Sequence, residues 1–233
     1  GMTIFCVINF SGNVGKSTTA RHLIYPRLAN GHLIPVETIN SDGSDDEAIK
    51  GKQFGELIDA LAVMDDAVVD VGASNVEDFI GLMKQYRGSH EDFDFFVVPT
   101  VPASKQQRDT ISTIDALSEI GVPPKKIRLV FNMVEFDADP KREFSGLFDY
   151  ATSAKNFTIN PHAVIHTNDI YGKLKGSEAS IDEILNDPTD WKEKIKTSTD
   201  AEEKVRYSQS LSIKRLAAGV SEELDAVFSA LTK

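Results

Sequence analysis

Apolar residues in the first 135 positions fall into short uninterrupted runs that alternate with longer amphipathic stretches. The amphipathic stretches predict helices at 16–28, 75–86 and 107–121. Several apolar runs show no alternation with polar residues, which is typical of strands in a parallel sheet covered on both faces. We therefore predict an α/β fold, a doubly wound, mostly parallel sheet with helices on both faces. The predicted strands are 3–10, 32–39, 67–73, 93–100, 127–134 and 162–167.

The remainder of the chain is more polar. Residues 172–210 are rich in Lys, Asp, Glu, Ser and Thr and lack a core-sized apolar set, so we interpret them as a surface insertion. From 211 to 232 the apolar residues return at helical spacing and predict a closing helix packed on the sheet. We expect residues 2–233 to form a single domain. The apolar stripe of the closing helix consists of Ile213, Leu216, Val220, Leu224, Val227, Phe228 and Leu231.

The segment SGNVGKST at 11–18 connects the first predicted strand to the first predicted helix. In that context, backbone N–H groups of the loop and of the helix start point at phosphates, and the helix dipole favours their charge. Lys16 can reach the β- and γ-phosphates, and the hydroxyl of Ser17 suits Mg²⁺. The strict pattern G-x-x-x-x-G-K-[ST] would require glycine where Phe10 stands, so a glycine turn with a chance Gly-Lys-Ser is the alternative. The predicted nucleotide-binding residues of the loop are Ser11, Gly12, Asn13, Val14, Gly15, Lys16, Ser17 and Thr18.

A carboxylate lies at the end of another apolar run. Asp70 ends the stretch DDAVVD and is followed by Gly72. A strand-end acid beside a phosphate loop is placed to support a nucleotide-bound Mg²⁺, usually through water. We therefore predict Ser17 and Asp70 as the metal residues; the alternative is that Asp70 caps the next helix.

The loop S-G-N-V-G-K-S-T resembles the variant (deviant Walker A) loop K-G-G-x-G-K-[ST] of the ParA/MinD family of P-loop ATPases. The resemblance extends over roughly residues 3–170, including FFVVPTVPASKQQ and VFNMV. Within the family the sequence is most similar to plasmid partition and stability proteins of the StbB/ParA kind. The resemblance implies that Asn132 contacts the base. ATP is favoured over GTP because Met133 replaces the lysine of the guanine motif N-K-x-D.

The sequence departs from the family at two functional positions. Ser11 replaces a lysine that, in the family, reaches the partner's nucleotide across a dimer, and a serine cannot do this. Ile39 aligns with the acid that orients the attacking water, whereas Glu37 aligns with the acid before it. Asn40 and Asp42 lie close enough to substitute, so the candidate catalytic residues are Lys16, Asp42 and Asn40, and hydrolysis is expected to be slow.

Composition constrains the partners. The formal charge is −11, and an acidic surface works against the counterion-driven DNA binding that clustered Lys and Arg support. A single cysteine, Cys6, permits no internal disulfide. No apolar run reaches the roughly 18 residues of a membrane span, and the start lacks the layout of a secretory signal. We expect a cytoplasmic protein without membrane contact, for which direct nucleic-acid binding is disfavoured.

The leading functional hypothesis is a Mg²⁺-dependent ATP-binding switch, a slow ATPase in plasmid or cargo partition. The resemblance implies a nucleotide-dependent homodimer and an adaptor protein as partners. Two alternatives stay open: a small-molecule kinase or ligase similar to dethiobiotin synthetase, and a module that binds nucleotide without hydrolysing it.

Overall fold

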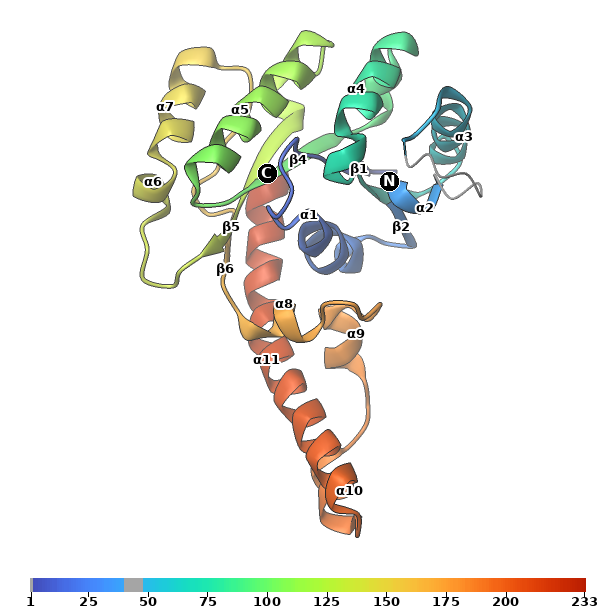
Figure 1. Ribbon diagram of the computed structural model, residues 1–233, viewed down its shortest axis with the longest axis vertical. Coiled ribbons are helices and arrows are strands. Elements are labelled where there is room, and N and C mark those ends of the chain that lie inside the picture. The colour runs from blue at the N-terminus through green and yellow to red at the C-terminus, as the bar shows by residue number, and fades with distance from the viewer. Residues whose placement is uncertain (1, 40–47) are drawn as a thin grey trace. The chain divides into compact units, whose positions relative to one another are not determined.

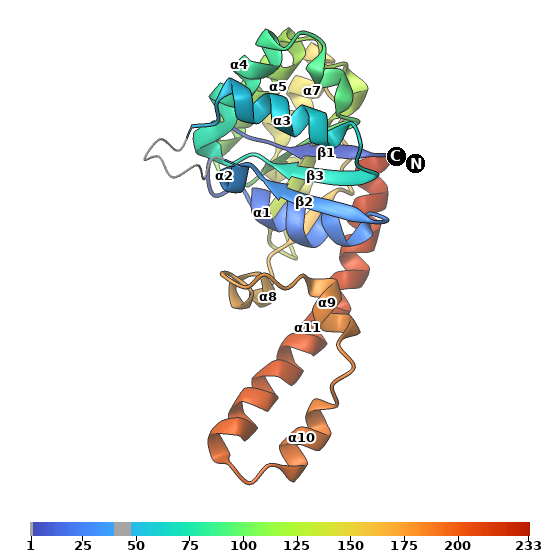
Figure 2. The ribbon, with the colours of Figure 1, turned by 90° about the vertical axis from the view of Figure 1, so that its right-hand side faces the viewer.

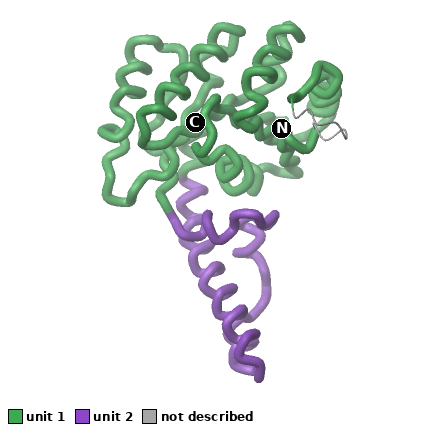
Figure 3. The backbone as a smooth tube through the Cα atoms, in the orientation of Figure 1, with its two compact units in different colours: residues 1–167, 227–233 green, residues 168–226 purple. Residues whose placement is uncertain are grey.

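The computed structural model describes residues 2–39 and 48–233. The chain divides into two compact units (Figure 3). The first unit extends to Thr167 and includes Val227–Lys233, and the second is Asn168–Ala226. Each unit has its own internal contacts. The single domain expected over residues 2–233 stays a prediction.

The first unit contains a six-stranded sheet in the order β2-β3-β1-β4-β5-β6, and every pairing is parallel. In Figure 2, α3, α4 and α5 lie on one face of this sheet and α1 lies on the other. The predicted doubly wound parallel fold is therefore confirmed. The strands are β1 Ile4–Val7, β2 Gly31–Pro35, β3 Asp66–Asp70, β4 Phe95–Thr100, β5 Ile127–Val134 and β6 Val164–His166.

Helices connect the successive strands of the first unit (Figure 1). The segment after β1 begins as α-helix, continues as π-helix over Thr19–Ile24 and ends as a 3₁₀ turn over Tyr25–Arg27. Pro26 lies in that last turn, and because it lacks an N–H it cannot continue an α-helix. The α-helices of this unit are α1 Lys16–Thr18, α2 Val36–Ile39, α3 Gly51–Leu61, α4 Val76–Gln85, α5 Ser104–Glu119, α6 Pro140–Glu143 and α7 Ser145–Ala154.

The core explains why the strands read as unbroken apolar runs. All residues of β1 and β3 are buried, because the sheet is covered on both faces. On the α3–α4 face, a chain of aromatic contacts links the helices to β4, with ring centroids 5.3 Å apart for Phe54 and Phe79 and 5.2 Å apart for Phe93 and Phe96. Such buried rings contribute large apolar areas and dominate core energetics. Burial also raises the pKa of the Cys6 thiol well above its usual value, so this cysteine is an inert core residue.

Two local expectations from the sequence need correction. The strand expected at 32–39 ends at Pro35, and Val36–Ile39 forms the short helix α2. The apolar pattern could not show this, because Val36 is buried whether it lies in a strand or in a helix. Residues 51–61, for which no element is predicted, form α3, which buries Phe54, Leu57 and Leu61.

The second unit is helical. Three of its helices begin with side-chain caps, in which Asn168, Ser180 and Asp190 accept hydrogen bonds from backbone N–H groups of the first turn. The helix expected at 211–232 is the later part of a longer helix that begins at Ala201 and ends in the first unit. No helix in the described part of the chain is both long and apolar enough to cross a membrane. The helices are α8 Asp169–Lys173, α9 Ile181–Asn186, α10 Trp191–Thr197 and α11 Ala201–Thr232.

Side-chain contacts hold the second unit together. Ser221 donates to Asp182 Oδ1 at 2.9 Å and Lys214 donates to the carbonyl of Asp187 at 2.7 Å, so both tie α11 to the α9 region. The Lys194 ammonium lies 5.7 Å from the ring centre of Trp191 and 5.4 Å from that of Tyr207. The contact with Tyr207 connects α10 to the first turns of α11, and the contact with Trp191 lies within α10.

Candidate functional site

The candidate site lies where the central strand β1 ends. The loop after β1 enters α1 at Lys16, and the carboxyl ends of β3 and β5 bring Asp70 and Asn132 to the same edge of the sheet. In open α/β sheets this edge is where ligands bind. Gly12, Asn13 and Ser17 are exposed on the loop, so an anion has access to the surface that the loop presents.

The loop backbone takes left-handed conformations at two positions. Asn13 has φ 57° and Gly15 has φ 81°. At Gly15 a Cβ would overlap the Asn132 side-chain amide, so both space and conformation favour glycine here. Directly after this turn, Thr19 N donates to Gly15 O at 2.9 Å and the helical segment begins. The first N–H groups of that segment lack partners within it and are available to an anion.

Lys16 is buried in the curl of this loop. Its Nζ donates to the carbonyls of Asn9, at 3.2 Å, and Ser11. Burial lowers the pKa of Lys16, while the negative charges of Asp70 and Glu37 raise it. The ammonium is therefore held at the centre of the loop by backbone oxygens, in the place where the sequence predicts a phosphate-binding lysine.

Ser17 and Asp70 are brought together as the sequence predicts for a metal-binding pair. Ser17 Oγ donates to Asp70 Oδ2 at 3.1 Å. The other carboxylate oxygen, Asp70 Oδ1, is buried and has no hydrogen-bond partner among the residues that the structure describes. Burial raises the pKa of Asp70 to about 6, against the opposing effect of the Ser17 hydrogen bond. An unsatisfied carboxylate oxygen beside a hydroxyl fits a hydrated Mg²⁺, which prefers oxygen ligands and keeps several waters.

No group of three or more His, Cys, Asp or Glu among residues 2–39 and 48–233 could hold a metal ion. A Mg²⁺ at Ser17 and Asp70 would accordingly need further ligands from phosphate oxygens and water. The pair fits a metal that arrives with a nucleotide.

Asn132 contacts the phosphate loop directly. Its Nδ2 donates to Val14 O at 3.1 Å, and its Oδ1 accepts from Met133 N at 2.9 Å. Both ends of the amide are thereby fixed, and the side chain fills the space above Gly15. The contact between Asn132 and a base stays a prediction, and the structure adds that this residue supports the loop.

Glu37 lies against the backbone of the segment after β3. A Cβ on Gly72 would overlap Glu37 Oε1, so the carboxylate occupies the space that glycine leaves. Glu37 is the acid that aligns with the first family acid. Asn40 and Asp42, the candidate catalytic residues that follow it, lie outside the described residues, and their roles stay predictions.

Sequence reasoning missed the contacts at the start of the loop. Asn9 Nδ2 donates to Thr110 Oγ1 at 3.0 Å, and Phe10 N donates to Thr113 Oγ1 at 3.0 Å. Ser11 Oγ donates to Asp109 Oδ2. These pairs are about a hundred residues apart in sequence, so no local pattern could have indicated them.

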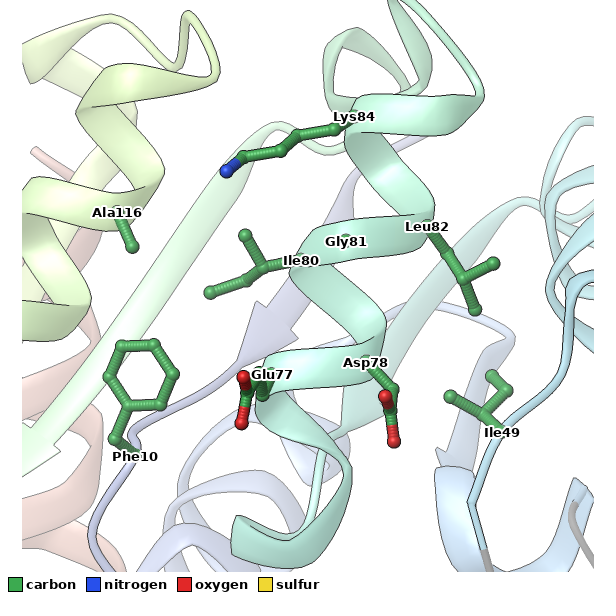
Figure 4. Close-up of a pocket in the computed structure, with 9 residues that line it drawn as sticks. All are labelled: Phe10, Ile49, Glu77, Asp78, Ile80, Gly81, Leu82, Lys84 and Ala116. Carbon is green, nitrogen blue, oxygen red and sulfur yellow. The ribbon is translucent and has the colours of Figure 1, made fainter.

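The side chain of Phe10 lines a groove of about 550 Å³ along α4 (Figure 4). There it faces Ile80 and Ala116, and it is part of the apolar packing around the core. Phe10 therefore replaces the glycine of the strict pattern by directing its ring into this groove.

No family model and no curated protein matches the chain. Among solved structures it is similar to the ParA of pNOB8, with a TM-score of 0.55, 10% identity and coverage of 98% of this chain and 99% of that one. It is also similar to apo McdA of Cyanothece, with a TM-score of 0.54, 13% identity and coverage of 96% of this chain and 100% of that one. For MinD of Pyrococcus horikoshii complexed with Mg-ADP the corresponding values are 0.52, 13%, 98% and 99%. The chain therefore has the fold of the ParA/MinD-type P-loop ATPases, as the resemblance of its loop predicts.

Proposed function

We propose that this chain binds ATP with Mg²⁺ and uses the nucleotide as a switch. The observation that carries the proposal is the arrangement at the end of β1: the Lys16 ammonium is enclosed by the loop, and the Ser17–Asp70 pair lies beside the same helix start. A site with one buried cation, free N–H groups and an acid paired with a hydroxyl is suited to a phosphate chain and its metal.

Each residue has a defined task in this proposal. Lys16 exchanges its backbone carbonyl partners for phosphate oxygens, and the N–H groups between Gly12 and Thr18 bind the remaining phosphate oxygens. Ser17 and Asp70 would hold Mg²⁺, directly and through water, and Mg²⁺ would neutralise phosphate charge. Asn132 keeps the loop closed over Gly15.

We further propose that the switch acts in the partition or stability of a plasmid or another cargo, through a nucleotide-dependent homodimer and an adaptor protein. The support is the fold shared with ParA and McdA and the resemblance of the loop. Ser11 stands where the family has its first loop lysine, so the homodimer would have to form without that cation. The cytoplasm is the proposed location.

Equilibrium binding of fluorescently labelled ATP with Mg²⁺ tests the proposal. Lys16→Ala should weaken binding at least about 100-fold, because the loss of a buried charge partner of phosphate costs several kcal/mol. Lys125→Ala, an exposed lysine near the start of β5, is the matched control and should leave affinity unchanged. Equal affinity in Lys16→Ala and the wild type would refute the assigned site.

The fate of bound ATP separates the remaining functional hypotheses. Slow conversion to ADP by the protein alone is expected for the switch. ATP that stays intact for days would instead indicate a binding module, and consumption that starts only with a small metabolite would indicate the kinase or ligase. Competition with unlabelled GTP tests the preference for ATP.

A further inference from the structure

Side chains of α5 accept hydrogen bonds from the three consecutive residues that lead into the phosphate loop, Asn9, Phe10 and Ser11. Thr110 accepts from Asn9 at 3.0 Å, Thr113 accepts from the backbone N–H of Phe10 at 3.0 Å, and Asp109 accepts from the Ser11 hydroxyl. Thr113 lies four positions after Asp109 and three positions after Thr110, so it is a neighbour of both on the helix surface. The two threonines are fully buried, whereas the Asp109 side chain is 32% exposed.

The Ser11–Asp109 bond differs from the other two because it involves a charged acceptor. The pKa of Asp109 is lowered by hydrogen bonds from Ser11 and Lys105, whose Nζ donates to the same Oδ2 at 3.1 Å. The carboxylate is therefore ionised at neutral pH, and hydrogen bonds to charged acceptors are stronger than neutral ones. Because Asp109 is partly exposed, substituting it should not open a cavity in the core.

Ser11 connects this bond to the centre of the site. Its backbone carbonyl accepts from Lys16 Nζ, and its N–H donates to Asn9 Oδ1 at 2.8 Å. Three different groups of one residue are thus engaged: the hydroxyl with α5, the N–H with the end of β1, and the carbonyl with Lys16. The hydrogen bond between the Ser11 hydroxyl and Asp109 therefore affects the position of the Ser11 carbonyl, and through it the position of the Lys16 ammonium.

We infer that Asp109 is a positioning residue of the phosphate loop. Its carboxylate fixes Ser11 through the hydroxyl, so that the Ser11 carbonyl holds Lys16 in the curl of the loop before a nucleotide arrives. A loop that is already ordered loses less conformational freedom on binding, and this raises affinity. The Asp109 carboxylate accepts from the Ser11 hydroxyl and from Lys105 Nζ, and it acts on the loop through Ser11.

Hydrogen–deuterium exchange of the nucleotide-free protein tests this role first. Asp109→Ala should increase exchange in peptides covering residues 8–18 by about three- to tenfold, the range expected when one hydrogen bond to a charged group is lost at a part-exposed site. Asp109→Asn keeps an acceptor oxygen but loses its charge, so it should increase exchange clearly less than Asp109→Ala does. Lys105→Ala removes the other partner of the carboxylate and should also stay within twofold.

A double-mutant cycle shows whether the effect passes through Ser11. Ser11→Ala should match Asp109→Ala, and the double variant should exchange no faster than either single one. Unchanged exchange in Asp109→Ala, additive effects in the double variant, or no rescue by Asp109→Asn would each overturn the inference. Thermal melts of all variants verify folding, and Ser11→Ala provides the same test if Asp109→Ala does not fold.

Affinity for labelled ATP with Mg²⁺ forms the second arm, and it rests on the proposed function. Asp109→Ala and Ser11→Ala should weaken binding about three- to tenfold, again with rescue by Asp109→Asn. If the wild type binds no ATP, the proposed function fails while the exchange arm still decides the role of Asp109. Binding by the wild type with equal affinity in Asp109→Ala would contradict the inference alone.

Discussion

The two ends of the phosphate loop are held by different chemistry. The first end, Asn9 to Ser11, is tied to α5 by three hydrogen bonds between side chains or from the backbone to a side chain. The second end, Val14 to Ser17, depends on the left-handed turn at Gly15 and on two side chains from other strands, Asn132 and Asp70.

The second end of the loop follows the family pattern, whereas the first end is particular to this chain. The second end carries the residues that the loop pattern specifies, and its geometry tolerates little change because Gly15 and Asn132 fill one space. The first end departs from the pattern at Phe10 and Ser11, and α5 supplies acceptors that suit these two residues. The comparison predicts severe effects of substitution at the second end and graded effects at the first.

Gly15→Ala should have the largest effect. The methyl group would overlap Asn132 Nδ2 and would force an L residue into φ 81°, so the free energy of unfolding should fall by about 2–4 kcal/mol. Gly12→Ala is the control, since its Cβ would only touch the Ala73 side chain at 4.0 Å, and it should change stability by less than about 0.5 kcal/mol. Urea unfolding measures both. Equal stability of the two variants would contradict the expectation that the second end of the loop, Val14 to Ser17, tolerates little change.

Asp70→Asn should change how stability depends on pH. The pKa of Asp70 is about 6 in the folded protein and 3.8 in the reference state, so folding favours its protonated form. Its contribution to stability is full below pH 3.8 and is lost as pH rises through 6. Relative to Asp70→Asn, the wild type should lose up to about 3 kcal/mol between pH 4 and pH 7. Urea unfolding without nucleotide at these pH values checks this; a difference that does not vary with pH would contradict the burial of the carboxylate.

Asn132→Ala should have a smaller effect, about 1–2 kcal/mol of stability, because it removes the hydrogen bonds to Val14 O and from Met133 N. It also removes the atom that a Cβ at position 15 would strike. In the Asn132→Ala background, Gly15→Ala should therefore cost at least about 1 kcal/mol less than in the wild type. If the stability effects of the two substitutions were strictly additive, Gly15 and Asn132 would not compete for the same space.

Much of the fold could be predicted from the sequence, because a parallel sheet buried on both faces produces apolar runs that mark each strand. The proximity of Ser17 and Asp70 could also be predicted, since Ser17 follows the loop lysine and Asp70 ends its own strand. Their role in holding a metal stays a prediction. The end of β2 could not be predicted, because Val36 would be an apolar, buried residue in a strand as well as in a helix. Helix α3 is not among the predicted elements, although Phe54, Leu57 and Leu61 follow a helical period.

The support of the loop could not be predicted from local patterns. Asp109 and Asn132 reach the loop from α5 and β5, and each contact joins residues about a hundred positions apart. Nothing in the neighbourhood of either residue in the sequence points to such a partner. Their roles follow only from the arrangement of the strands.

The central claim is that the backbone between Ser11 and Thr18 encloses a triphosphate. Backbone amide NMR spectra of the ¹⁵N-labelled protein, recorded before and after addition of ATP and Mg²⁺, test this most directly. The account predicts that the largest shift changes, downfield as for N–H groups that donate to phosphate, occur at residues 12 to 18 and are absent in Lys16→Ala. Unchanged amides in this stretch, with ATP-dependent changes elsewhere or nowhere, would contradict it.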